Sequence, residues 1–336
     1  MKDRLLQYLA CPACGGEIGL EDVERREGGE VLEGALGCAA CARRFPVRRG
    51  VPRFVEPAKI EGKQVATAEN FGWQWQHFTQ QDERYAEQFL GWIAPVSSDF
   101  FRGRVVLEGG CGKGRHTRLV AGWGARDVVG IDLSDAVETA FAATRELENA
   151  HIIQADIYHL PLRRRAFDYA FSVGVLHHLP RPRAGFCALA EKVKLGGHLS
   201  AWVYGAENNE WLVRWVSPLR EQITSRISQR ALLHLSKVPA ALVFAATKLV
   251  YGPLNRHPRG AALAGRLFYN HYLNSISRFG WREQHTIVFD HLVAPTAFYI
   301  PREEFEQWWR DIGASHVQIS WHNRNSWRGT GRIQKG

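Results

Sequence analysis

Short apolar runs alternate with amphipathic stretches of helical period through the middle of the chain. Helices are predicted at residues 115–123, at 134–148 with Ser134 as the N-cap, and at about 183–194. The apolar runs predict five strands, RVVLEG, DVVGID, HIIQAD, FDYAFSV and HLSAWVY, which start at residues 104, 127, 151, 167 and 198. Strands that alternate with helices build an α/β fold with a doubly wound parallel sheet, and such sheets bind ligands at the carboxyl ends of their strands.

The end of the chain follows a different pattern. A helix is predicted at 301–312, with Pro301 at its start, and two strands at 315–322 and 326–333 form a hairpin. The intervening residues 206–300 are predicted to be a mostly helical insertion, with one strand-like run, TIVF, at 286–289.

The first strand of the sheet runs into a glycine-rich loop, LEGGCGKG, at residues 107–114. It is not a Walker A loop, GxxxxGK[ST], because Gly114 stands after Lys113 where serine or threonine is needed. It is not a dinucleotide fingerprint, GxGxxG, because neither frame supplies the third glycine. The spacing that it has is acidic-x-Gly-x-Gly-x-Gly, which begins at Glu108.

This spacing resembles motif I of the class I S-adenosylmethionine (SAM)-dependent methyltransferases. The resemblance continues through Asp132 in GIDLS, Asp156 after the third strand, FDYAFSVGVLHHLPRP and KLGGHLSAWVYG, and it covers about 100–205 and 300–333. The fourth-strand motif is similar to that of the ubiquinone/menaquinone C-methyltransferase-like branch. The resemblance implies a Rossmann-like seven-stranded sheet in which the chain's last helix and hairpin complete the core.

SAM carries no phosphate, so its site needs no anion cradle. Glycines let the backbone approach the methionine moiety closely, and Glu108 offers negative charge near the cationic part of the ligand. Asp132 is expected to accept both ribose hydroxyls, with capping of the next helix as its alternative role, and the resemblance implies that Asp156 binds the adenine amino group. The full set expected at S-adenosyl-L-methionine is Glu108, Gly110, Cys111, Gly112, Gly114, Asp132, Leu133, Asp156, Ile157, Ser172 and Val173, although ordinary packing is the alternative for Cys111.

Four of the six cysteines form two CxxC pairs, Cys11 with Cys14 and Cys38 with Cys41. Two such pairs at this distance have the spacing of a zinc ribbon, in which four thiolates hold a structural Zn2+ and leave no position open for water. Disulfides and a redox CxxC are the rival interpretations. The surrounding sequence, residues 4–57, resembles the Trm112-like zinc-ribbon family, whose members activate methyltransferases or are fused to them.

These patterns divide the chain into five parts. They are a zinc ribbon at 1–58, linker and lid helices at 59–102, a SAM-binding core at 103–205, a helical acceptor-recognition insertion at 206–300, and the completing helix and hairpin at 301–336. The aromatic stretch at 70–78 is expected either to cover SAM as a lid or to pack against the ribbon.

The net charge of +9 is concentrated in one segment. Residues 211–282 carry eleven Lys/Arg and one acid, a balance of +10, which leaves about −1 for the rest. Such a segment favours peripheral contact with an anionic membrane or with RNA, whereas a solvated basic face is the alternative. The apolar stretch at the N-terminus is too short for a secretory signal. We also expect no transmembrane segment, since the apolar run at 238–250 is interrupted by polar residues and proline. We therefore expect a cytoplasmic protein, in peripheral contact with a membrane.

Methyl transfer requires alignment of the acceptor with the methyl group, and a base only where the acceptor must lose a proton. The candidates for a catalytic role are His177, after the fourth strand, and His291 and Tyr299 in the insertion; a structural role is the alternative for His177. We expect an enzyme, a SAM-dependent methyltransferase with a small-molecule or amphipathic metabolite as acceptor. The alternatives are an RNA (tRNA or rRNA) methyltransferase and a non-catalytic scaffold of the same fold.

Overall fold

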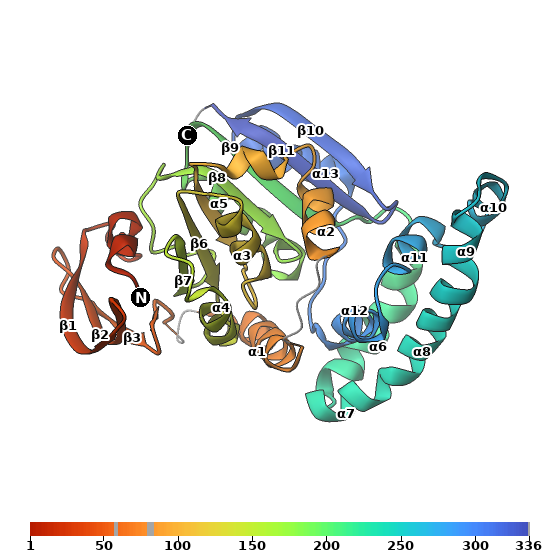
Figure 1. Cartoon of the computed structure of the whole chain (residues 1–336), viewed down its shortest axis with the longest axis horizontal. Helices are drawn as coiled ribbons and strands as arrows, with labels where there is room; N and C mark the ends of the chain where they lie inside the picture. The colour runs from red at the N-terminus through yellow and green to blue at the C-terminus, as the bar shows by residue number, and fades with distance from the viewer. Residues whose placement is uncertain (57–59, 79–83, 335–336) are drawn as a thin grey trace. The chain divides into compact units, whose positions relative to one another are not determined.

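The computed structural model describes residues 1–56, 60–78 and 84–334 (Figure 1). The expected boundary between ribbon and linker, at residue 58, lies outside the described residues. The chain divides into two compact units. The core unit comprises Met1–Val203, Glu303–Ser320 and Arg328–Gly336, and the helical unit comprises Tyr204–Arg302 and Trp321–Trp327.

A seven-stranded sheet has the order β10-β11-β9-β8-β5-β6-β7. Its strands are β5 (Val105–Gly109), β6 (Asp127–Asp132), β7 (Ala150–Gln154), β8 (Phe167–Val173), β9 (Val193–Tyr204), β10 (Ala314–His322) and β11 (Ser326–Ile333). The central pairs β5·β6, β5·β8, β6·β7 and β8·β9 are all parallel. The prediction of a Rossmann-like seven-stranded sheet is therefore confirmed.

The helices around this sheet are shorter than the sequence pattern suggests. They are α1 (Gly62–His77), α2 (Arg84–Ile93), α3 (Arg115–Gly122), α4 (Ala136–Thr144), α5 (Pro182–Ala190) and α13 (Arg302–Asp311), with 3-10 turns η3 (Ser98–Phe101) and η4 (Leu176–His178). Ser134 is not the N-cap of α4, because that position belongs to Asp135. The Ser134 hydroxyl donates to Asp132 at 2.7 Å and accepts the N–H of Ala136, the first residue of α4, at 3.3 Å.

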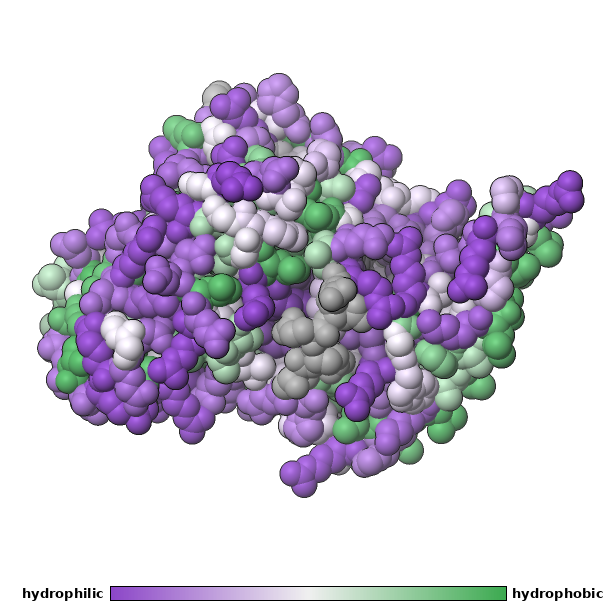
Figure 2. All heavy atoms as spheres, viewed as in Figure 1, coloured by the Kyte–Doolittle hydropathy of each residue, from purple (hydrophilic) through white to green (hydrophobic). Residues whose placement is uncertain are grey.

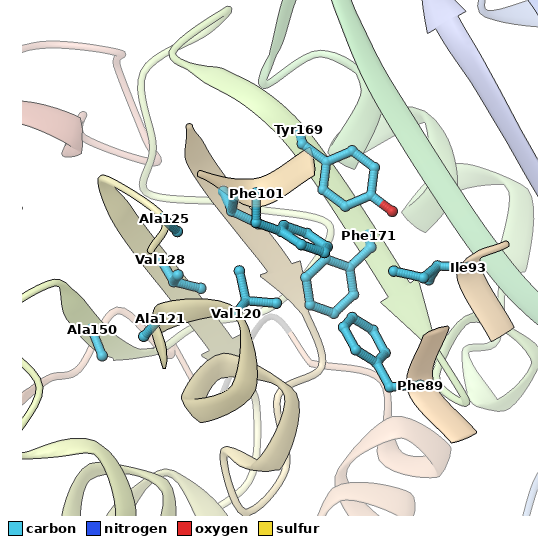
Figure 3. Close-up of a cluster of buried hydrophobic side chains, with 11 residues drawn as sticks. Phe89, Ile93, Phe101, Val120, Ala121, Ala125, Val128, Ala150, Tyr169 and Phe171 are labelled. Atoms are coloured by element: carbon cyan, nitrogen blue, oxygen red, sulfur yellow. The ribbon is translucent and has the colours of Figure 1, made fainter. Parts of the chain in front are cut away.

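Aromatic side chains fill the space between the sheet and α2. Phe89 of α2 stacks on Phe101 at 6.3 Å between ring centroids and meets Phe171 of β8 at 5.0 Å (Figure 3). Beside α5, Trp309 of α13 contacts Phe186 and covers the glycines of β11. A Cβ on Gly329 would lie 2.9 Å from Trp309, so glycine is what admits the indole there.

The N-terminal segment forms its own four-stranded sheet, of order β1-β2-β3-β4. Its elements are η1 (Asp3–Tyr8), β1 (Ile18–Glu27), β2 (Glu30–Cys38), β3 (Arg44–Arg48) and β4 (Val51–Pro52). Beyond β4 the chain pairs with the edge strand β7, where Phe54 donates its N–H to the Gln154 carbonyl at 2.8 Å. Asp127 of β6 is fully buried and connects η1 to the seven-stranded sheet by accepting from Arg4 and Tyr8; it also accepts from His151 of β7.

The helical unit is built around α12 (Trp281–Val293). Its other elements are η5 (Leu212–Val216), α6 (Ser217–Gln222), η6 (Thr224–Arg226), α7 (Gln229–Leu235), α8 (Lys237–Ala246), η7 (Thr247–Tyr251), α9 (Gly252–Asn255), α10 (Pro258–Ala264) and α11 (Asn270–Ile276). The strand-like reading of 286–289 is wrong, because this apolar run lies inside α12. A short apolar run fits a buried helix turn as well as a strand, and here Gln284 and His285, just before it, are buried too.

The consecutive elements α7, α8, η7 and α9 make up one helix, Gln229–Asn255. By length and composition this helix could cross a membrane, and 17% of its most apolar window is buried. Length and composition alone do not show that this helix crosses a membrane, so the expectation of no transmembrane segment stays a prediction. The prediction rested on the shorter run at 238–250, whereas the helix continues through Lys237 and Lys248.

Candidate functional site

The loop after β5 has the backbone that its glycines predict. Gly110, Gly112 and Gly114 all have positive φ, at 81°, 51° and 77°. A Cβ on Gly110 would lie 2.2 Å from the side chain of Val175, so the loop is closely packed as well as left-handed. The Gly112 position faces Trp75 of α1, whose Nε1 would lie 3.0 Å from an added Cβ.

Glu108, the acidic residue of the motif, is buried at the end of β5. Its carboxylate accepts from Thr117 Oγ1 at 2.5 Å and contacts His116 Nδ1 at 3.1 Å. Burial and the neighbouring Arg115 charge lower the pKa of His116, so its ring is neutral at pH 7. Glu108 thus holds the start of α3 against the loop, a positioning role that the sequence analysis did not anticipate.

Asp132 lies at the carboxyl end of β6, beside the loop. Its Oδ2 accepts the Gly112 N–H at 2.9 Å, and its Oδ1 accepts the N–H and hydroxyl of Ser134 at 2.9 and 2.7 Å. Burial raises the pKa of Asp132, against the effect of these hydrogen bonds. A carboxylate has about four acceptor positions, so three of them are already used by the described residues. One ribose hydroxyl therefore fits directly, whereas accepting both requires Ser134 to turn away.

Helix α1 covers this edge of the sheet. Its Gln64 Nε2 donates to Asp156 Oδ1 at 2.8 Å, its Phe71 ring lies 4.9 Å from that of His178, and its Trp75 faces Gly112. Of the two expectations for the aromatic stretch at 70–78, a lid agrees with these contacts. Gln64 is a site residue that sequence reasoning missed, because a single glutamine in an amphipathic helix carries no signal of its own.

The remaining predicted SAM residues lie around the loop with mixed surroundings. Ser172 Oγ donates to the Gly109 carbonyl at 2.8 Å and fastens β8 to β5. Cys111 points into an apolar cluster with Val137 and Ile152, which agrees with packing, and burial raises the pKa of its thiol well above the usual value. Ile157 is buried, and Leu133 and Val173 are half-buried.

Of the three candidates for catalysis, the structure brings two together. His291 and Tyr299, both in the helical unit, lie on Tyr204 with ring centroids 5.7 and 5.8 Å away. Burial lowers the pKa of His291 to about 4 and raises the pKa of Tyr299, so both side chains are neutral at pH 7. His177 belongs to the core unit, where it is fully buried against the rings of His178 and Trp202.

The four cysteines of the N-terminal segment converge as predicted. Their sulfur atoms all lie within 4.8 Å of one another, with Cys11 3.6 Å from Cys41 and Cys14 3.5 Å from Cys38. Backbone N–H groups, that of Cys41 foremost, lower the pKa of Cys38 to about 6, which favours the thiolate. Gly16 leaves room for this cluster, because a Cβ there would lie 3.2 Å from two of the sulfurs. The donor set and geometry fit tetrahedral zinc.

Comparison with known proteins supports the predictions for two parts of the core unit, the N-terminal segment and the SAM-binding sheet. Residues 107–201 match the model of a methyltransferase domain, and residues 2–50 match that of Trm112p-like proteins. The chain thus carries a class I SAM-dependent methyltransferase domain behind a Trm112-like N-terminal segment, as predicted.

Two curated relatives are both named tRNA U34 carboxymethyltransferase. That of Pseudoalteromonas translucida is 32% identical over 160 residues, 47% of this chain and 42% of the relative. That of Shewanella pealeana is 30% identical over 235 residues, 64% of this chain and 62% of the relative. The alignments thus span less than two thirds of either relative. A solved SAM-dependent methyltransferase from Mesorhizobium loti is 25% identical, with a TM-score of 0.30, over 32% of this chain and 54% of its own.

These relatives correct two expectations. The expected ubiquinone/menaquinone C-methyltransferase-like branch is wrong, since the relatives carry the name of a tRNA-modifying enzyme. The expected small-molecule or amphipathic metabolite acceptor is wrong for the same reason. The physical cause of both errors is that the donor loop and its acidic residues indicate the donor alone. The insertion was interpreted as the recognition site of a small-molecule or amphipathic acceptor.

Proposed function

We propose that this chain is a SAM-dependent methyltransferase that acts on tRNA. The observation that carries the proposal is the identity of 30% or more to tRNA U34 carboxymethyltransferases in a chain that has the class I donor loop. The whole activity is a proposal because these alignments span only part of each relative.

The donor side of the proposal rests on the loop and two carboxylates. Gly110, Gly112 and Gly114 would lie against the methionine moiety, and Asp132 would accept a ribose hydroxyl through its remaining acceptor position. Asp156 would bind the adenine amino group beside Gln64, which already holds one of its oxygens. SAM supplies a methyl group activated by a positive sulfur, so these residues need only hold and align it.

The acceptor side rests on charge. Residues 222–282 of the helical unit contain nine Lys/Arg and no acid. Arg256, Arg259 and Arg266 are exposed there, where they can bind phosphates of the RNA backbone. For proton transfer we keep His291 and Tyr299 as candidates: the neutral imidazole can accept a proton or hydrogen bond and the neutral phenol can donate one.

We also infer that Cys11, Cys14, Cys38 and Cys41 hold a structural zinc ion. The convergence of four sulfurs in a small segment supports this, since such a segment depends on metal binding for its folding energy.

The tRNA proposal is tested by binding at several salt concentrations. The triple variant Arg256→Gln/Arg259→Gln/Arg266→Gln should weaken tRNA binding and reduce the slope of log affinity against log salt by about 2 to 3. The matched control removes three exposed arginines of the core unit, Arg102→Gln/Arg164→Gln/Arg310→Gln, and should retain the slope better. Equal loss in both triples would show that the helical unit has no special role, and absence of tRNA binding by the parent would refute the proposal.

The relatives' name raises a second candidate, transfer of a carboxymethyl group in place of methyl. Mass spectrometry of nucleosides from modified tRNA distinguishes the two groups by their masses.

A further inference from the structure

The helix Gln229–Asn255 exposes a row of apolar side chains along its length. Leu235, Val238, Leu242, Ala245, Leu249 and Pro253 recur every three or four positions, the period of one helix face, and all are exposed. Leu242 and Leu249 are 70% and 77% exposed, far more than scattered surface leucines require. We call these six residues the outward stripe. Hydrophobic residues along this helix are visible in Figure 2.

The opposite face of the same helix is partly polar. Ser236 and Thr247 are buried against α12, where their hydroxyls lie 2.9 Å from His285 Nε2 and 2.9 Å from Gln284 Oε1. A helix on a water-exposed surface normally turns its leucines inward and its hydroxyls outward. This helix buries Leu232 and Ala240 together with these hydroxyls and leaves the six apolar residues of the outward stripe exposed, so the stripe is suited to an apolar environment.

The charged residues around the outward stripe indicate which kind of partner it contacts. Exposed Arg226, Arg230 and Lys237 lie at its N-terminal end and Arg256 just beyond its C-terminal end, in a segment without acidic residues. Cationic residues beside an apolar helix face match the anionic headgroups and acyl chains of a bilayer surface.

Three other environments fit less well. A second copy of the chain would bring the same cations together from both helices, whichever way they paired. RNA offers charge but no apolar surface for a leucine row. Passage across a bilayer would expose the buried hydroxyl contacts with α12 to lipid or break them, and polar groups left unsatisfied in lipid are strongly unfavourable.

We propose that the outward stripe docks the protein on an anionic membrane surface, with the helix lying in the plane of the interface. The inference does not rest on the proposed tRNA substrate, because no residue of the outward stripe is assigned to RNA. Of the charged residues beside the stripe, Arg256 alone is also among the arginines assigned to RNA.

Vesicle flotation tests the proposal with the full chain. The parent should float with vesicles of phosphatidylcholine and phosphatidylglycerol, and markedly less with phosphatidylcholine alone. Leu242→Glu/Leu249→Glu should reduce partitioning at least about tenfold, since it removes apolar burial and adds like charge to the lipid's. The control Val23→Glu/Leu195→Glu carries the same added charge on exposed apolar positions of the core unit and should float like the parent. Circular dichroism verifies that each variant is folded.

The same variants identify the wrong partner if the proposal fails. Failure of the parent to float with anionic vesicles overturns it, as does equal flotation of the Leu242→Glu/Leu249→Glu variant. If that variant instead converts a parent dimer to a monomer, or loses tRNA binding, while no vesicle binding is seen, the stripe is an interface for a second copy or for RNA.

Discussion

At the scale of single residues, Asp132 connects the donor loop to the next strand. It pins Gly112 and Ser134 at once, so it preorganises the loop before any ligand binds. The sequence analysis set ligand binding against helix capping for this residue. The structure shows a related local role, in the turn before α4, and leaves one acceptor position for a ligand.

We predict that Asp132→Ala weakens SAM binding by about 10- to 100-fold, because a hydrogen bond to a charged group contributes roughly 1.5–3 kcal/mol. Isothermal titration measures the affinity. Asp135→Ala, an exposed acid three positions away, is the matched control and should bind SAM like the parent. Unchanged affinity in Asp132→Ala would remove this residue from the site.

A second residue-scale prediction concerns the loop backbone. Gly110→Ala should lower the free energy of unfolding by about 2 kcal/mol or more, because φ is 81° and the new methyl would meet Val175. Gly122→Ala, at the end of α3 with open space around its Cβ position, should be neutral or stabilising by up to about 1 kcal/mol. Urea unfolding compares the two. Equal stability of both variants would contradict the close packing of the loop.

At the scale of elements, the N-terminal segment is a four-stranded sheet in which the two CxxC pairs bring four cysteines together. We predict one zinc ion per chain, lost in Cys14→Ser and retained in Cys187→Ser, with elemental analysis as the measurement. Loss of the metal should expose residues 1–53 to proteases, since their small core cannot fold alone. Full zinc content in Cys14→Ser would show that these cysteines are not the ligands.

The sheet was the most predictable group of elements. The predicted bounds of β6 and β8 agree with the structure at both ends, because both are short, largely apolar runs of strand length. The docking of the ribbon could not be predicted. It depends on buried Asp127, which Arg4, Tyr8 and His151 reach from distant parts of the sequence. The prediction of a strand at 286–289 failed because one threonine and three apolar residues do not distinguish a strand from a buried helix turn.

The candidate site likewise contains residues that could be predicted from the sequence and residues that could not. The glycines and Asp132 were found because a loop with positive φ and an acid at a strand end leave a residue-type signature. The sequence analysis did not predict Gln64, and it predicted Trp75 only as part of the aromatic stretch at 70–78. The contacts of both residues depend on where α1 packs. The prediction of the acceptor was wrong, because acceptor recognition is spread over a surface. The sequence shows the charge of that surface but does not identify the molecule that binds it.

At the scale of the whole molecule, buried histidines make stability depend on pH. Burial lowers the pKa of His116, His151 and His291, the last to about 4. The unfolded chain takes up these protons near pH 6.5, whereas the folded chain does not. The free energy of unfolding should therefore fall as pH drops from about 6.5 towards 4, by up to about 1.4 kcal/mol per pH unit for each histidine.

Urea unfolding at pH 7 and pH 5 measures this dependence. His291→Gln removes one of the histidines with a lowered pKa and should make the decline shallower. A urea unfolding midpoint that stays constant between pH 7 and pH 5 would contradict the neutral state assigned to these buried histidine rings.

The central claim, that this chain transfers a group from SAM to tRNA, is tested most directly by incubating the purified protein with methyl-labelled SAM and bulk tRNA. The account predicts label in the tRNA fraction that resists exchange with unlabelled SAM and is strongly reduced with Asp132→Ala. No label in tRNA, with label instead in a lipid or small-molecule extract supplied in parallel, would contradict it.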